Sequence, residues 1–192
     1  EAICKAADEL FEGKLDGNFP LAVWQTGSGT QSIMNVNEVL ARRAGQILED
    51  AGSSTRLHPN DHVNKGQSSN DTFPAAMHIA AVTEVEDLLL PATAELRACF
   101  ENLSAQYMDI VKIGRTHLQD AVPITLGQEI GGWRASLEQD LRILGLALEQ
   151  LKELAAGGTA VGTGLNAPED FGNIVAVIYV FVTLGSLAVF LA

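Results

Sequence analysis

The chain has 192 residues, of which 47% are hydrophobic and 19% charged, so it can bury a core and is not intrinsically disordered. Twelve Lys and Arg against 24 Asp and Glu give a net charge of −12, which argues against a general nucleic-acid binder. A small anionic ligand stays compatible, because an acidic body can still carry local donors. The two cysteines, Cys4 and Cys99, form neither a disulfide framework nor a zinc-site spacing, which favours a reducing compartment.

The first third of the chain predicts two helices separated by polar loops. Residues 1–12 have a helical pattern that ends at Gly13, and they read as the middle of a helix, so we expect a fragment of a longer protein. A second helix is predicted over 35–51, with Asn35 as its N-cap and Gly52 after its end. Residues 52–71 form a polar loop, and a loop of this length is usually functional.

Long helices dominate the rest of the chain. A helix is predicted from about Thr72, with Pro74 in its first turn and a kink at Pro91. A short strand over 110–113 and a polar loop over 114–124 precede a helix that Thr125 and Gln128 cap and that runs to about 156. Residues 174–192 carry no charge and read either as a buried bundle helix or, by length alone, as a membrane segment.

Polar loops carry the candidate chemistry. The segment 26–31, TGSGTQ, places Ser28 and Thr30 between glycines, where backbone N–H groups can turn toward an anion. The segment 58–71 gathers imidazoles, amides and hydroxyls, and Ser69 and Asn70 precede a helix whose N-terminus favours a carboxylate or phosphate. We expect Asp61 and Asp71 to cap or orient neighbours rather than bind a metal. The alternative for both segments is an ordinary turn or solvated loop.

The segment 114–123, GRTHLQDAVP, contains His117, whose side chain suits proton transfer near neutral pH. Arg115 could hold a ligand carboxylate or, equally, a structural Asp. A lone loop histidine can also be a plain surface residue. Together, polar loops rich in neutral donors and poor in metal ligands indicate a small anionic substrate whose charge is stabilised without a metal.

Longer stretches of the sequence resemble class II fumarases of the aspartase/fumarase superfamily. The resemblance covers about residues 1–171 and is carried by WQTGSGTQSIMNVNEVLARRA from Trp24, HPNDHVNKGQSSNDTFPAAMHIA from His58, GRTHLQDAVPITLGQE from Gly114 and GGTAVGTGLNA from Gly157. It implies a mainly α fold, a long-helix bundle with short strand-like pieces and polar active-site loops. Residues 1–67 would be the C-terminal part of an N-terminal helical domain, and residues 68–192 the first, incomplete part of the central bundle.

The resemblance also implies a function, the reversible hydration of fumarate to (S)-malate in the tricarboxylic acid cycle, by a homotetramer whose active sites are shared between subunits. Neither a metal nor a cofactor is expected. The residues that would bind substrate carboxylates are Ser28, Thr30, Ser68, Ser69 and Asn70. Thr116 and His117 would be catalytic, with His117 positioning and activating water, and His58, Asn60 and Asp61 would form a second dicarboxylate site.

One departure from the family limits these expectations. The signature loop Gly-Ser-Ser-x-Met-Pro-x-Lys-x-Asn, which carries the serine assigned as general base, does not occur in the 192 residues. We therefore expect the chain to be inactive by itself. The alternatives are an aspartate ammonia-lyase of the same superfamily and an inactive assembly fragment. A cytoplasmic location is expected, with the mitochondrial matrix as the alternative, and membrane insertion is not expected.

Overall fold

The computed structural model describes residues 1–22 and 29–177, and its regular structure is mainly helical. The elements are α1 (Ala2–Phe11), a 3₁₀ turn (Asp16–Asn18), α2 (Thr30–Asp50), a π-helical turn (Pro59–Val63), α3 (Ser69–Glu84), a second π-helical turn (Val85–Leu89), α4 (Leu90–Gln106), β1 (Val111–Thr116), β2 (Gln119–Thr125) and α5 (Leu126–Leu151). Residues 171–177 are also helical.

The chain divides into two compact units. The first unit comprises residues 1–78 and 154–192, and the second unit comprises residues 79–153. The boundary falls within α3, between His78 and Ile79. The two units are defined by the contacts within this chain. The domain boundary predicted after residue 67 stays a prediction.

The core of the first unit lies where α1 packs against α2. Ala6 and Ala44 have no exposed surface, and Leu40 joins them in one cluster. Small side chains at these positions let the two helix backbones approach closely, and larger apolar side chains close the edges of the contact. Beside this core, Arg43 of α2 forms a two-pronged ion pair with Glu9 of α1.

Two helices of the first unit begin earlier than predicted. Helix α2 begins at Thr30, after Gly29 in the left-handed conformation, so the prediction of Asn35 as N-cap is wrong. The Asn35 side chain instead donates to the Asn18 carbonyl at 3.2 Å, from within the helix. Helix α3 begins at Ser69 rather than Thr72, which places Pro74 beyond the first turn. Gly52, with φ +77°, ends α2 as predicted.

In the second unit, the predicted disturbance at Pro91 takes the form of a π-helical turn. The N–H of Leu90 donates to the carbonyl of Val85, five residues back, and Pro91 then stands in the first turn of α4. Proline has no N–H to donate, so the helical hydrogen bond that another residue at position 91 would make cannot form. Lys152, just after α5, pairs with Glu86 of the π-helical turn at 3.1 Å. This pairing raises the pKa of Lys152.

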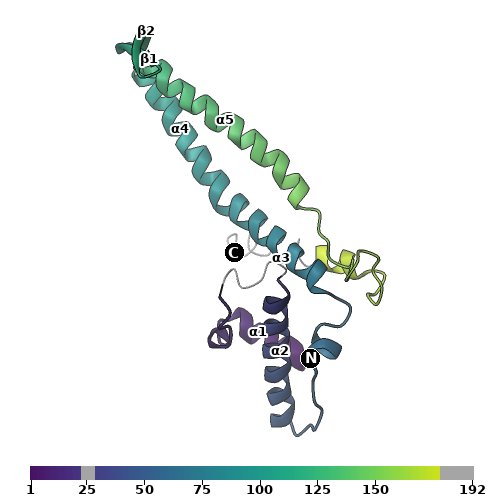
Figure 1. Cartoon of the computed structure of the whole chain (residues 1–192). Coiled ribbons are helices and arrows are strands. Elements are labelled where there is room, and N and C mark those ends of the chain that lie inside the picture. The colour runs from purple at the N-terminus through teal and green to yellow at the C-terminus, as the bar shows by residue number, and fades with distance from the viewer. Residues whose placement is uncertain (23–28, 178–192) are drawn as a thin grey trace. The chain divides into compact units, whose positions relative to one another are not determined.

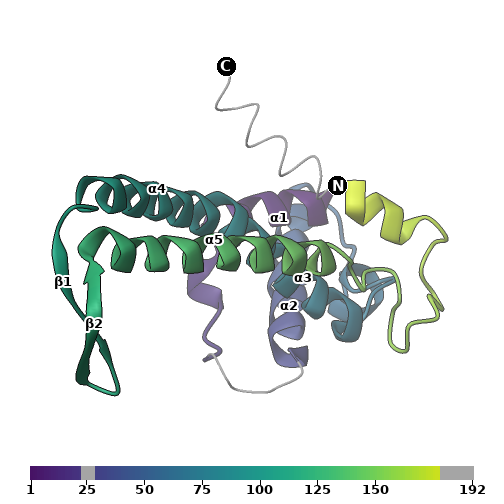
Figure 2. The same cartoon turned by 90° about the horizontal axis from the view of Figure 1, so that it is seen from above.

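Helices α4 and α5 lie side by side along their length (Figures 1 and 2). Near the hairpin end, Ser104 Oγ donates to the Gly127 carbonyl at 2.7 Å, and a Cβ on Gly127 would lie 2.4 Å from the Ser104 carbonyl oxygen. Only glycine fits that approach. Phe100 and Trp133 add a tilted ring contact with centroids 5.8 Å apart.

The capping box predicted for α5 is confirmed, whereas its predicted end is wrong. The Gln128 N–H donates to Thr125 Oγ1 at 3.0 Å, and the Thr125 N–H donates to Gln128 Oε1 at 2.9 Å. Helix α5 ends at Leu151, five residues before the predicted end near 156, and Lys152 follows as its cap.

Residues 114–124, predicted as a loop, form most of an antiparallel hairpin instead. Strands β1 and β2 pair from Val111 opposite Thr125 to Thr116 opposite Gln119, with an irregularity at Gly114. The turn is made by His117 and Leu118, with φ of +47° and +60°. Positive φ at both central residues is what a type I′ hairpin turn requires. Arg115 pairs across the hairpin with Asp120 at 3.2 Å, as the structural alternative for Arg115 anticipated.

The apolar segment 174–192 lies mostly outside the described residues, which end at 177. Within residues 1–22 and 29–177, no helix combines the length and the apolar character needed to cross a membrane.

The Glu9–Arg43 pair predicts an acid-sensitive attachment of α1. The hydrogen bond from Arg43 holds the pKa of Glu9 below its usual value. Its stabilising effect is therefore fully present above the pKa that Glu9 has when unfolded and is lost as pH falls through the lower, folded pKa. In the full-length protein, Glu9→Gln should speed amide hydrogen exchange of α1 at pH 7. After correction for intrinsic exchange rates, the difference from the unaltered protein should vanish at an acid pH below the lowered pKa of Glu9.

Asp8→Asn is the matched control for this prediction. Asp8 lies on the same helix, and among the described residues its carboxylate makes no hydrogen bond or ion pair. The variant should leave the exchange of α1 unchanged at both pH values. Equal effects of the two variants, or an undiminished Glu9→Gln effect in acid, would show that the ion pair does not hold α1.

Candidate active site

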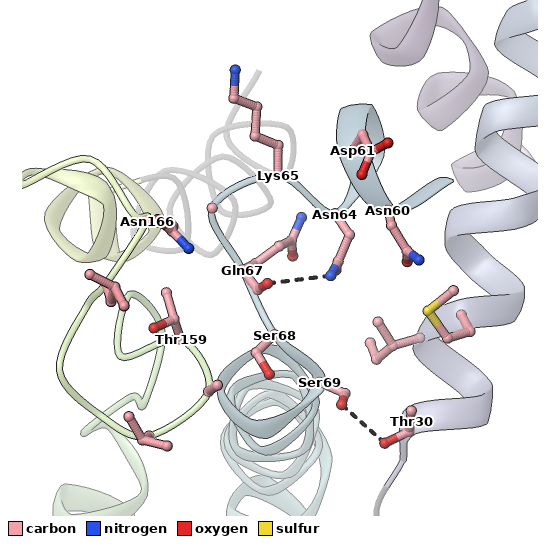
Figure 3. A pocket seen from close by; sticks show the side chains of 16 residues that line it. Thr30, Asn60, Asp61, Asn64, Lys65, Gln67, Ser68, Ser69, Thr159 and Asn166 are labelled. Atoms are coloured by element: carbon pink, nitrogen blue, oxygen red, sulfur yellow. Dashed lines mark hydrogen bonds between the residues drawn. The ribbon is translucent and has the colours of Figure 1, made fainter. Parts of the chain in front are cut away.

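A polar cavity of about 560 Å³ opens in the first unit (Figure 3). Three segments wall it: the start of α2, the stretch from the π-helical turn to the start of α3, and the loop after α5. The residues that line it are Thr30, Ile33, Met34, Asn60, Asp61, Asn64, Lys65, Gly66, Gln67, Ser68, Ser69, Thr159, Ala160, Val161, Leu165 and Asn166. Three of the predicted carboxylate-binding residues, Thr30, Ser68 and Ser69, are therefore brought together. Ser28 lies outside the described residues.

The N-termini of α2 and α3 meet at one wall of this cavity. Thr30 Oγ1 and Ser69 Oγ, each in the first turn of its helix, lie 3.0 Å apart and share a hydrogen bond (Figure 3). Gly29 makes this meeting possible, because a Cβ at this position would lie 2.2 Å from the Phe73 ring. Its φ of +70° is a second reason for glycine. Two converging helix N-termini favour a bound anion.

Ser68 caps α3 and is itself held by Asp71. Ser68 Oγ accepts the Asn70 N–H at 3.2 Å, and Asp71 Oδ1 accepts the Ser68 N–H at 2.9 Å. The capping role expected for Asp71 is thus present. The Asn70 side chain donates to the Ala160 carbonyl at 3.0 Å, so this predicted substrate-binding amide is oriented by the 157–167 loop.

A chain of amides stiffens the wall between the π-helical turn and α3. Asn37, which is 4% exposed, donates to Asn64 Oδ1 at 3.1 Å. Asn64 donates in turn to the Gln67 carbonyl at 3.3 Å (Figure 3). The Thr72 hydroxyl lies 3.0 Å from Gln67 Oε1 and 3.1 Å from Asp71 Oδ1. These bonds fix the backbone that leads into Ser68 and Ser69.

The predicted second dicarboxylate residues lie on the π-helical turn. Asn60 and Asp61 line the same cavity as Ser69, whereas His58 caps the turn and is not among the lining residues. The His58 N–H donates to His62 Nδ1 at 2.8 Å, and the Asp61 N–H approaches His58 Nδ1 at 3.4 Å. His58 Nδ1 also lies 3.4 Å from Asp61 Oδ2.

The predicted catalytic pair belongs to the second unit. Thr116 ends β1, and His117 occupies the hairpin turn, where both side chains are exposed. Neither lines the cavity described above. His117 has a positive φ, which is uncommon for a residue other than glycine, and the chain turns sharply at this residue.

The polar groups that line the cavity are mainly neutral. Asp61 and Lys65 are the ionisable residues among those that line it, and Lys65 extends away from Ser69 and Thr30 (Figure 3). Hydroxyl, amide and helix N-terminal N–H groups supply the remaining donors. Within the described ranges, no group of three His, Cys, Asp or Glu residues is placed to hold a metal ion.

The sequence offered Asn37 as a cap, a turn former or a binding amide, and the fold places its side chain against Asn64. Thr159 was not predicted as a site residue, and the fold brings it to the cavity. Thr159 lies in a Gly-rich loop, and only its contact with Asp71, 88 positions away, distinguishes it from its neighbours.

Gly29→Ala should damage the site through the meeting of α2 and α3. The added methyl would collide with the Phe73 ring and would disfavour the positive φ, which alone costs about 1–2 kcal/mol. In the full-length protein we expect a thermal unfolding midpoint several degrees lower, measured by scanning fluorimetry.

Gly45→Ala is the control, because it lies within α2 with open space around its Cβ position and should not destabilise. Phe73→Leu combined with Gly29→Ala should recover part of the loss, since it relieves the collision but not the backbone strain. An unchanged midpoint for Gly29→Ala would contradict the tight packing described here.

Comparisons with known proteins show the family to which the chain belongs. A family profile described as lyase matches residues 1–188. A class II fumarate hydratase of Oceanobacillus iheyensis is 59% identical over 173 residues, which are 90% of this chain and 38% of the relative. One from Nitrosomonas europaea is 59% identical over 176 residues, 91% of this chain and 38% of the relative. The chain thus spans about two fifths of the length of these relatives.

Solved structures support the fold. A class II fumarase from Schistosoma mansoni superposes with a TM-score of 0.85 at 46% identity, covering 95% of this chain and 38% of that one. A fumarate lyase:delta crystallin from Brucella melitensis, bound to cobalt, gives 0.77 at 39% identity, with 96% and 40% covered. The mainly α, long-helix fold and the resemblance to class II fumarases are confirmed. The chain belongs to the lyase family that these relatives represent.

Proposed function

We propose that the full-length protein containing this chain hydrates fumarate to (S)-malate reversibly. The observation that carries the proposal is the meeting of two helix N-termini at a cavity lined by Thr30, Ser68 and Ser69. Donors of this kind suit a carboxylate, and the relatives at 59% identity are named class II fumarate hydratases. The tricarboxylic acid cycle is the expected setting.

Neutral donors fit the chemistry of the reaction. When malate is the substrate, a base removes the carbon-bound proton next to a carboxylate, and that carboxylate becomes a dianionic aci-form. Serine, threonine and asparagine donors stabilise the growing charge without neutralising the base, as a cation close by would tend to do. His117 would activate water in one direction and help hydroxide depart in the other. The base itself is expected on the signature loop, which these 192 residues do not contain.

We also propose that the active unit is a homotetramer with shared sites. The second unit supports this, because α4 and α5 leave large apolar side chains exposed although they pack on each other. Leu96 is 45% exposed, Trp133 51% and Leu146 73%. Apolar faces of this kind are typical of surfaces that another chain covers. A shared site would let a hairpin from one subunit serve a cavity formed by others.

The first test is an assay of the full-length protein with fumarate in buffer free of ammonia, followed by loss of fumarate absorbance and by chiral analysis of malate. Formation of (S)-malate is the expected result. Formation of aspartate that depends on added ammonia would favour the ammonia-lyase alternative. The 192-residue chain alone is expected to form no malate, and steady turnover by it would overturn that expectation.

His117→Asn should lower turnover of the full-length protein by about 10²-fold or more, the range for loss of a general acid or base. Asn tolerates a positive φ, so the turn should persist while the titrating group is lost. Leu118→Asn, at the other positive-φ position of the same turn, is the matched control and should retain turnover. Equal losses in both variants would mean that turn geometry, and not the imidazole, matters.

Mixed assemblies extend this test to the shared site. Coexpressed His117→Asn and Ser69→Ala subunits should regain part of the native activity, because some sites would then combine two unaltered contributions. No recovery in verified mixed tetramers would place both residues in the same subunit's site.

A further inference from the structure

Asp71 is a buried carboxylate that does not line the cavity but bonds to Ser68 and Thr159, which do. It is 2% exposed, and among the described residues no Lys, Arg or His forms an ion pair with it. Its carboxylate accepts the Ser68 N–H at the start of α3, where the helix dipole favours an anion, and the Thr159 N–H of the 157–167 loop. A buried charge with this satisfied arrangement is costly to alter, which points to a specific task.

The two carboxylate oxygens of Asp71 hold different segments. Oδ1 accepts the Ser68 N–H at 2.9 Å, and Oδ2 accepts the Thr159 N–H at 2.7 Å. A second bond runs in the opposite direction, from the Asn70 side chain to the Ala160 carbonyl at 3.0 Å. The 157–167 loop is thereby fastened to the first turn of α3 at two adjacent points.

The loop conformation needs this attachment. Thr159 has φ +59°, an outlying value for a β-branched residue, and it is 8% exposed. Backbone strain of this kind persists where surrounding contacts over-determine it. The bond from Thr159 to Asp71 is such a contact, and Thr159 itself lines the cavity.

We propose that Asp71 is a positioning residue: its carboxylate clamps the 157–167 loop to α3 and so sets where the Ser68, Ser69 and Asn70 donors stand for the substrate. This assignment rests on the proposed function for its substrate, since the donors are the predicted carboxylate ligands. Asp71 acts through them and does not touch the substrate itself.

Asp71→Asn tests the clamp because it keeps the shape and removes one acceptor. The amide nitrogen would face either the Ser68 N–H or the Thr159 N–H, so one of the two attachments must break. In the full-length protein we expect the KM for fumarate and the Kd for succinate, an unreactive dicarboxylate, to rise by about tenfold or more, while kcat changes by less than about threefold. Amide exchange of 157–167 should accelerate, and that of α1 should not.

Ala44→Val is the control for general destabilisation, because it overpacks the α1–α2 core without reaching the cavity. It should lower the thermal midpoint and leave KM and succinate binding unchanged. A tenfold KM effect from Ala44→Val, or an Asp71→Asn protein with unaltered KM, Kd and loop exchange, would overturn the proposal.

The unaltered protein supplies a measurement that holds even if Asp71→Asn fails to fold. Peptides that cover Thr159 should exchange slowly, and rapid exchange there would contradict the clamp. If the full-length protein forms no malate, the proposed function fails, whereas succinate binding and loop exchange still decide the role of Asp71.

Discussion

The hydrogen bond from the Thr159 N–H to Asp71 joins segments 88 positions apart, and the cavity depends on that connection. Together with the bond from Asn70 to the Ala160 carbonyl, it fastens the Gly-rich loop after α5 to the start of α3, and residues of that loop from Thr159 to Asn166 line the cavity. The bond is short at 2.7 Å, buried and charge-assisted, all of which strengthen a hydrogen bond. One carboxylate thus serves both as the cap of a helix and as the attachment of a loop.

Gly29 supplies the complementary constraint on the opposite wall. Its missing side chain admits the Phe73 ring, and this contact brings the first turns of α2 and α3 close enough for Thr30 and Ser69 to share a hydrogen bond. The result is a concentration of positive helix ends on a chain whose net charge is −12. An anion is thus favoured locally although the body as a whole repels it.

The second unit combines close helix packing with exposed apolar side chains. Its helices α4 and α5 pack through small groups such as Gly127 and Ser104, while bulky side chains such as Trp133 and Leu146 stay exposed. The hairpin at its end is held by the Arg115–Asp120 pair and turns at His117. Exposed apolar side chains of this size are typical of surfaces that another chain covers.

Local patterns in the sequence determined the helical class, the capping box at Thr125 and Gln128 and the end of α2 at Gly52, because each depends on residues within a few positions of one another. The sequence also showed which polar residue types the loops around the cavity would carry. Tertiary structure decided the rest. The hairpin at 117–118 lacks the glycine or asparagine that usually marks a type I′ turn, so its pairing was not visible in the sequence. Helix α2 begins at Thr30 because Gly29 packs on Phe73, and Asp71 meets Thr159 only once the chain has returned from α5. Such contacts join distant segments, and no local propensity encodes them.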